Sequence, residues 1–187
     1  MQDRLTKSDW IAHGFRTLAE NGPNALTVGA MATALKVSRG SFYWHFHDVA
    51  DFRAQILQSW QERTTDRVIQ LIDTAPGPSR LNQLLHRAFD PDGGFDGRDD
   101  HHWLAEQAIR SWAAGDAAIA EVVAGVDASR IAYIAQLLVG IGVDEPRALS
   151  RAAFMYWAYL GRSFVMERRH SSIASPALTD IAGIFSR

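Results

Sequence analysis

The stretch Thr27–Phe52, TVGAMATALKVSRGSFYWHFHDVADF, decides the fold, because it contains two short helical patterns separated by a brief connector. Thr27 is a residue type that caps helices, and the apolar residues after it recur at three- and four-residue steps, the period of one buried helical face. These apolar positions are Val28, Met31, Ala32 and Leu35. The connector is Lys36-Val37-Ser38, and Ser38 is placed to cap the second helix through its hydroxyl.

The second helix is expected over residues 39–46, with Phe42 and Phe46 four residues apart and facing a small core. The residues that then point elsewhere are Arg39, Ser41, Tyr43, Trp44 and His45. Exposed large aromatic side chains normally have something to contact. In a helix-turn-helix the second helix lies in the major groove of DNA, while flanking groups hold phosphates. The pattern therefore predicts a DNA-binding helix-turn-helix.

From about Thr6 to Phe52 the sequence resembles the N-terminal domain of the TetR (tetracycline repressor) family of bacterial transcriptional regulators. The matching features are Ile11, Phe15 and Leu18 in a first helix, Glu20-Asn21-Gly22, Leu26-Thr27-Val28, and the run KVSRGSFYWHF over residues 36–46. The last run is the specific part. The resemblance implies an all-helical homodimer with a DNA-binding head in each subunit. It also implies a C-terminal domain that binds a small molecule and releases the operator.

The resemblance also implies which residues face DNA. The residues at those positions are Thr27, Ser38, Arg39, Gly40, Ser41, Tyr43, Trp44 and His45. The alternative for Tyr43 and Trp44 is packing between the head and the following helix, and for His45 a structural role. Gly40 either permits close approach of the backbone to the groove or is a helix defect.

One position departs from the family pattern. Where family members usually carry a lysine at the start of the fourth helix, this chain has Val49, preceded by His47 and Asp48. A phosphate anchor is therefore missing from that position. Either DNA affinity is weaker, or the contact comes from His47 or from the helix N-terminus itself.

Composition limits the function classes. The 187 residues, of which 47% are hydrophobic, suffice for one large or two small globular domains. The formal charge is −2, and residues 1–55 hold six basic and five acidic residues, a net charge of +1, which predicts few phosphate contacts. The absence of cysteine excludes disulfides and thiolate metal sites. No signal peptide is recognised and no apolar run approaches roughly 18 residues, so a cytoplasmic protein is expected.

The predicted fold class is all-α with about nine helices. A helix-turn-helix domain is expected over residues 1–47 and an effector-binding and dimerisation domain over residues 48–187. A long fourth helix at about residues 48–74 connects them and ends before Pro76-Gly77-Pro78. A loop is expected over residues 90–100. Further helices are expected over residues 81–89, 103–112, 116–139, 145–167 and 175–186.

The helix that follows Asp144 carries information about assembly, because its residues 152–165 are apolar nearly all round. Two faces of such a helix must be covered, one by its own domain and the other most simply by a two-fold symmetry mate. The candidate dimer-interface residues are Tyr133, Leu137, Phe154, Leu160 and Phe164.

Aromatic walls with a few polar groups are typical of a small-molecule site. The candidate ligand-binding residues are His86, Trp103, Gln107, Arg110, Tyr156 and Trp157. The alternative is that these aromatic residues belong to the core. Arg110, if buried, needs either an acidic residue of the protein or an anionic ligand.

No catalytic residue, metal or cofactor is expected. The adjacent His101 and His102 point different ways on a helix, and no nucleophile elbow, zinc-protease motif or phosphate-binding loop is present. The sequence predicts a homodimeric regulator, a repressor that binds palindromic double-stranded operator DNA and leaves it when an unknown small molecule binds. Its two reading helices are expected roughly 34–36 Å apart. The alternative is a helical small-molecule-binding dimer that has lost specific operator binding.

Overall fold

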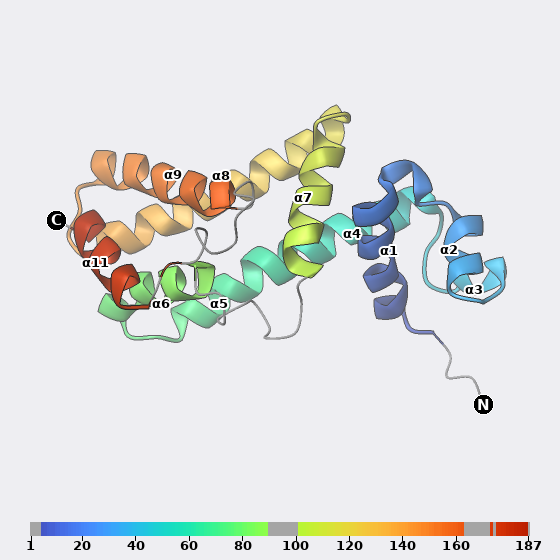
Figure 1. Cartoon of the computed structure of the whole chain (residues 1–187), viewed down its shortest axis with the longest axis horizontal. Coiled ribbons are helices and arrows are strands. Elements are labelled where there is room, and N and C mark those ends of the chain that lie inside the picture. Colours follow the sequence, from blue (N-terminus) through green and yellow to red (C-terminus); the bar gives the residue numbers. More distant parts are fainter. Residues whose placement is uncertain (1–4, 90–100, 163–172, 174, 187) are drawn as a thin grey trace. The chain divides into compact units, whose positions relative to one another are not determined.

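A computed structural model describes residues 5–89, 101–162, 173 and 175–186. Every regular element in these residues is helical (Figure 1). The described part of the chain holds nine α-helices. In this count residues 49–73, which are labelled as three consecutive helical elements, are one continuous helix. The predicted all-α fold of about nine helices is confirmed.

The chain forms two compact units, the first of which comprises Met1–Arg63 and Asp100–Val123. Its helical elements are α1 (Lys7–Asn21), the 3₁₀ turn η1 (Pro23–Ala25), α2 (Val28–Ala34), α3 (Arg39–Tyr43), α4 (Val49–Gln61) and α7 (His101–Ala113). Within this unit α7 packs on α1 and α4. Gly14 of α1 allows close approach to α4, because a Cβ there would lie 2.7 Å from Cδ1 of Ile56.

The second unit comprises Thr64–Asp99 and Ala124–Arg187. Its helices are α5 (Arg67–Asp73), α6 (Gly77–Phe89), most of α8 (Ala117–Gly140), α9 (Glu145–Gly161) and α11 (Ser175–Ser186). Its core is built from Leu, Ile, Val, Met and Ala side chains of these helices. The first unit contains α4 and α7 in addition to the helices of the head, so it does not have the predicted domain bounds. The predicted division into a domain of residues 1–47 and a domain of residues 48–187 stays a prediction.

The connecting helix differs from the regular helix predicted for residues 48–74. A π-helical turn, η2 (Glu62–Asp66), separates α4 from α5. A π turn holds more residues than an α turn. Within it, the adjacent Thr64 and Thr65 are both buried. The boundary between the two units, Arg63 to Thr64, falls inside this turn.

Several predicted helix ends were displaced. The second helix of the helix-turn-helix ends at Tyr43 instead of residue 46, with Trp44 as its C-cap residue. The backbone N–H of Phe46 still donates to the carbonyl oxygen of Phe42 at 3.1 Å, so these two rings stay on one face. The helix predicted from residue 81 already begins at Gly77. The predicted loop at residues 90–100 and the last predicted turn of the helix after Asp144 lie outside the described residues.

One helix contradicts the expectation that no stretch is apolar enough to cross a membrane. Ala117–Gly140 is long enough and has a mean hydropathy of 1.5 over its most apolar 18-residue window. This is weak evidence, since the core helix of a soluble protein meets the same criterion of length and composition. The expectation failed because the alanine, valine, isoleucine and leucine residues of this helix raise the mean hydropathy although Glu121, Asp127 and Arg130 interrupt the apolar run.

Candidate DNA-reading surface and apolar cavity

An aromatic cluster holds α3 in place within the first unit. The side chain of Phe42 is fully buried, and its ring centroid lies 5.4 Å from that of Trp10 and 5.4 Å from that of Phe52. Phe46 is buried beside it, with ring centroids 5.0 Å apart. The predicted inward face of the second helix is therefore confirmed. Since α3 is attached through this face, its other face is the one that can contact a partner.

The turn between α2 and α3 has a defined helix-ending geometry. The N–H of Val37 donates to the carbonyl oxygen of Ala32 at 3.0 Å, and the N–H of Lys36 donates to that of Thr33 at 3.1 Å. Lys36 has φ 55°, the left-handed conformation in which glycine is most common. This Schellman-type pattern ends α2 and redirects the chain into α3.

Two predicted caps have different outcomes. The hydroxyl of Thr27 accepts the N–H of Ala30 at 3.3 Å, which confirms that Thr27 caps α2. Its own O–H remains a donor that suits a phosphate oxygen. Ser38 occupies the N-cap position of α3, but its side chain makes no capping hydrogen bond, so that part of the prediction was wrong.

The outward face of α3 and its C-cap exposes two large aromatic residues. Tyr43 is 59% exposed and Trp44 is 75% exposed. This exposure disfavours the alternative that they pack between the head and the following helix. Four more of the residues predicted to contact DNA are exposed, namely Thr27, Ser38, Arg39 and Gly40. Ser41, which is also predicted to contact DNA, is half-buried.

His45 has a partner within the chain. Its Nε2 atom lies 3.0 Å from the carbonyl oxygen of Leu5, and the side chain is half-buried. This contact joins the C-terminal side of α3 to the segment that precedes α1. It favours the structural role that the sequence left open, and a DNA contact by His45 stays a prediction.

Carboxylates occupy the start of α4. Asp48 accepts the N–H of Asp51 at 2.8 Å, and Asp51 in turn accepts the N–H of His47 at 2.8 Å. The hydrogen bond from Asp51 and a second one from the His47 ring hold the pKa of the Asp48 carboxyl below its ordinary value. Two negative charges at this helix end disfavour a phosphate there. The His47 side chain, 90% exposed, is the better-placed group for such a contact.

Arg39 lies against the first turn of α2. A Cβ added to Gly29 would be 3.1 Å from the Nη2 atom of Arg39. The small size of Gly29 therefore helps to set the position of the guanidinium that is expected to reach DNA.

Changing Gly29 to alanine tests this contact. The added methyl group should displace the Arg39 guanidinium by a few tenths of an ångström. Thermal unfolding should show a stability equal to the wild type or higher by up to about 1 kcal/mol, because alanine favours the helix. Fluorescence anisotropy should show a few-fold weaker binding to the operator DNA. Unchanged DNA affinity would mean that this contact does not position Arg39.

The six predicted ligand-binding residues differ in where the structure places them. Tyr156 lines the cavity described below, whereas His86, on α6, is not among the lining residues. Gln107 and Arg110 belong to α7 in the first unit, and Trp157 is 65% exposed. The side chain of Trp103 lies outside the described set. Arg110 has the acidic partner that burial demands, since its Nη2 atom lies 2.8 Å from Oε1 of Glu106.

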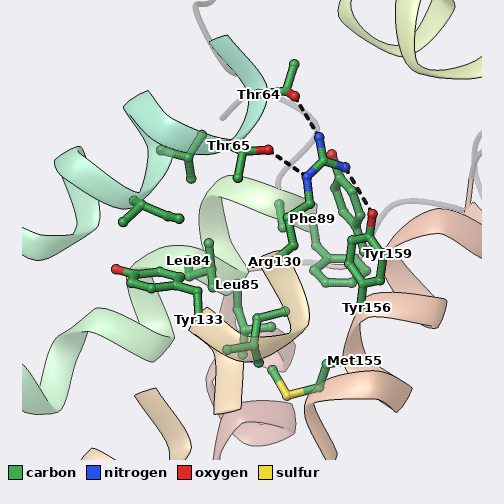
Figure 2. A pocket seen from close by; sticks show the side chains of 14 residues that line it. Thr64, Thr65, Leu84, Leu85, Phe89, Arg130, Tyr133, Met155, Tyr156 and Tyr159 are labelled. Atoms are coloured by element: carbon green, nitrogen blue, oxygen red, sulfur yellow. Dashed lines mark hydrogen bonds between the residues drawn. The ribbon is translucent and has the colours of Figure 1, made fainter. Parts of the chain in front are cut away.

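A largely apolar cavity lies within the second unit (Figure 2). It is open to solvent at its mouth, and about 600 Å³ in and around it, open solvent included, is free of protein atoms. The apolar residues that line it are Val68, Ile69, Leu84, Leu85, Ala88, Phe89, Ile134 and Met155. The polar or amphipathic ones are Thr64, Thr65, Arg130, Tyr133, Tyr156 and Tyr159.

Arg130 is the charged residue in this wall, and it is only 9% exposed. It donates to the hydroxyl oxygens of Thr65 at 2.8 Å, Thr64 at 2.6 Å and Tyr156 at 3.0 Å. Figure 2 shows this fan of hydrogen bonds at one side of the cavity. The Tyr156 hydroxyl donates onward to Asp127 at 2.7 Å. The sequence signal that was missed is an arginine, three residues after Asp127, within the mostly apolar helix at residues 117–140.

Tyr133 closes another part of the wall. Its hydroxyl donates to Oδ1 of Asp73 at 3.0 Å. Burial, together with this hydrogen bond to a carboxylate, raises the pKa of Tyr133 far above its ordinary value. The phenol is therefore neutral at physiological pH.

Comparisons with known proteins agree with this geometry. Residues 11–52 match the family model of the bacterial regulatory proteins of the tetR family. A transcriptional regulator from Rhodococcus sp. Rha1 is similar in structure with a TM-score of 0.68 and 19% identity, over 97% of this chain and 94% of that one. A protein assigned as a TetR-family transcriptional regulator from Rhodococcus sp. has a TM-score of 0.64 and 20% identity, over 98% and 97%.

A third similar structure is that of a protein assigned as a transcriptional regulator from Streptomyces coelicolor A3(2), with a TM-score of 0.63 and 15% identity over 96% of this chain and 98% of that one. No curated protein matches the chain. The chain shares the fold of these three proteins. Residues 11–52 match the TetR-family model, so the resemblance stated from the sequence is confirmed for this part of the chain.

Proposed function

We propose that this protein is a ligand-responsive repressor, which binds a palindromic operator as a homodimer and leaves it when a small molecule occupies the cavity of the second unit. The observation that carries the proposal is the outward face of α3, where Tyr43 and Trp44 are exposed beside Arg39. Large aromatic side chains beside a cationic one fit a phosphate-lined groove better than they fit solvent.

The cavity supports the ligand-responsive part of the proposal. Its apolar lining and few polar groups are the usual composition of a small-molecule site. Two of its residues, Thr64 and Thr65, belong to the π turn of the helix that leaves the head. A ligand that binds differently to two states of this turn would shift the population between them, which is the energetic requirement for release from DNA.

Exposed apolar residues of α9 support the homodimer. Phe154 and Trp157 are 57% and 65% exposed, and Leu149 on the same helix is 56% exposed. Of the predicted interface residues, Leu137 is buried in its own unit, Tyr133 and Leu160 are half-buried, and Phe164 lies outside the described residues. Phe154 therefore carries the interface proposal, with Trp157 added from the structure. A cytoplasmic location is proposed because operator DNA is there.

The proposal is tested by fluorescence anisotropy with the chain's own upstream intergenic DNA and a scrambled control, at two salt concentrations. We expect tighter binding to the upstream DNA and weaker binding at higher salt, with a small slope because the head is barely basic. Equal, weak binding to both DNAs would favour the alternative, a ligand-binding dimer without specific operator binding. The two carboxylates at the start of α4 and Val49 are the observations on the side of that alternative.

Two substitutions test the assignment of the reading helix. Arg39→Ala should weaken operator binding by about 10-fold or more, since a good arginine contact with a base is worth about 1–3 kcal/mol. Tyr43→Phe should weaken it a few-fold through loss of one hydroxyl hydrogen bond. The matched control is Arg67→Ala, an exposed arginine of α5 in the second unit. Normal operator affinity in both head variants would refute the assignment.

A further inference from the structure

The charged side chain in the wall of the cavity already has hydrogen-bond partners within the protein. The Nε atom of Arg130 donates to Thr65 at 2.8 Å, and its Nη2 atom donates to Thr64 at 2.6 Å. Its Nη1 atom donates to Tyr156 at 3.0 Å, and that hydroxyl donates onward to Asp127 at 2.7 Å. Each nitrogen of the guanidinium therefore takes part in holding the wall together (Figure 2).

A charged group on a ligand gains little at such a wall. A carboxylate would have to displace hydroxyl groups from Arg130, close to a cluster that already contains the carboxylate of Asp127. An ammonium group would approach the guanidinium, which carries the same charge. Either group would also lose its hydration, a cost that is recovered only when the protein pairs the charge. The wall therefore favours a ligand without charge.

Aromatic rings form part of the same wall. The rings of Phe89 and Tyr159 meet edge to face with centroids 6.3 Å apart, and those of Tyr156 and Tyr159 lie at an interplanar angle of 24° with centroids 6.1 Å apart. The flexible thioether of Met155 is a further lining group. Aromatic rings and thioethers both attract a further ring beyond the effect of apolar burial alone. A ring should therefore bind here better than a saturated group of similar size.

We propose that the cavity binds an uncharged aromatic molecule, whose ring packs among the apolar and aromatic side chains of the wall. The inference rests on the proposed ligand-responsive function and names the chemical class of the effector. Such a ligand leaves the hydrogen bonds from Arg130 to Thr64 and Thr65 intact. Binding therefore stabilises η2, the irregular turn that contains both threonines, in the conformation that these hydrogen bonds hold.

Matched probes on the wild-type protein test the absence of charge without any substitution. Nitrobenzene and benzoate have nearly the same shape and differ in charge, and so do ethylbenzene and protonated benzylamine. Isothermal titration calorimetry near neutral pH, below the solubility limit of each probe, compares the members of each pair. We expect the uncharged member to bind about 10-fold or more tightly. A smaller preference in either pair, tighter binding of a charged probe, or no detectable binding of the uncharged probes would overturn the proposal.

A saturated analogue tests the requirement for a ring. Cyclohexylmethanol and benzyl alcohol are both uncharged, and the saturated ring is the more apolar of the two. If burial of apolar surface alone decided the affinity, cyclohexylmethanol would bind more tightly. We expect benzyl alcohol to bind at least as tightly, because the rings of the wall contact its ring. Tighter binding of cyclohexylmethanol in the same titration would overturn the aromatic class.

A matched pair of variants tests the place of binding. Leu84 lines the cavity, whereas the neighbouring Gln83 is exposed and does not line it. Leu84→Trp should weaken ethylbenzene binding by about 10-fold or more, because the indole occupies part of the cavity, and Gln83→Trp should change it by less than about 2-fold. Equal affinities in the two variants would place the probe elsewhere and overturn the proposal. If circular dichroism shows that Leu84→Trp does not fold, the wild-type comparisons decide alone.

The DNA titration separates this inference from the proposed function. Selective binding of the uncharged aromatic probes that leaves operator affinity unchanged would support the ligand class and contradict the proposed release from DNA. Salt-sensitive operator binding without any preference for the uncharged probes would overturn the ligand class and leave the DNA-binding proposal standing.

Discussion

Phe42→Ala is expected to lower the free energy of unfolding of the DNA-binding unit by about 3–5 kcal/mol, the usual range for removing a fully buried phenylalanine. The ring has no exposed surface and contacts Trp10 and Phe52 edge-on. These contacts connect α3 to α1 and α4, so the cavity left by alanine lies where the three helices meet. Chemical denaturation followed by circular dichroism measures the loss, and operator binding should weaken because α3 is no longer held in place.

Trp44→Ala is the matched control for this prediction. The Trp44 side chain is 75% exposed and only two residues further along the chain. We expect a change in unfolding free energy of less than about 1 kcal/mol, together with weaker DNA binding if the indole contacts the phosphate backbone. Similar stability losses in both variants would contradict the division of this segment into an inward face and an outward face.

The head was predictable from the sequence because its signals are local. Thr27 and Asp48 cap the helices that follow them, each by accepting the N–H of the residue three positions later. Phe42 and Phe46 share a buried face, as their four-residue spacing predicts. The left-handed Lys36 was beyond prediction, since nothing in a lysine favours that conformation.

The cavity was not predictable in the same way, because it depends on contacts between residues far apart in the chain. Arg130 contacts Thr64, which is 66 positions away, and this contact accompanies a π turn that helical periodicity does not indicate. The aromatic residues singled out in the sequence divide between exposed surface and wall, with Trp157 exposed and Tyr156 buried. Adjacent residues on a helix differ in direction by about 100°, so composition alone could not assign them.

The packing of α7 on the head could not be predicted from local sequence signals either. Trp60 and Glu106, which form a hydrogen bond, are 46 positions apart in the chain. Both lie in the first unit, where α7 also packs on α1. The sequence did contain one signal, because Glu106 and Arg110 are four residues apart, the spacing at which opposite charges pair along a helix. That spacing would have supplied the acidic partner that Arg110 was expected to need.

Glu106→Ala is expected to destabilise the first unit by about 3 kcal/mol, within the range for breaking a buried ion pair by removing one partner. The Glu106 side chain is almost fully buried, and its Oε2 accepts the indole N–H of Trp60 at 2.8 Å. Its Oε1 accepts the Nε–H of Arg110 at 2.8 Å. Alanine removes both acceptors. The indole N–H of Trp60 and the guanidinium of Arg110 each then lose a hydrogen bond in a place that is shielded from water.

A double-mutant cycle isolates the contact between the connecting helix and α7. Trp60→Phe removes the indole N–H and Glu106→Ala removes its acceptor, so each single change abolishes this hydrogen bond. If the indole N–H and the carboxylate interact as the 2.8 Å distance indicates, the two changes should be non-additive by about 0.5–3 kcal/mol in urea unfolding. Additive losses would mean that this hydrogen bond does not help to hold α7 to the head, where Ala105, Ile109 and Trp112 of α7 are also buried. In that case the buried carboxylate would serve Arg110 and not the connecting helix.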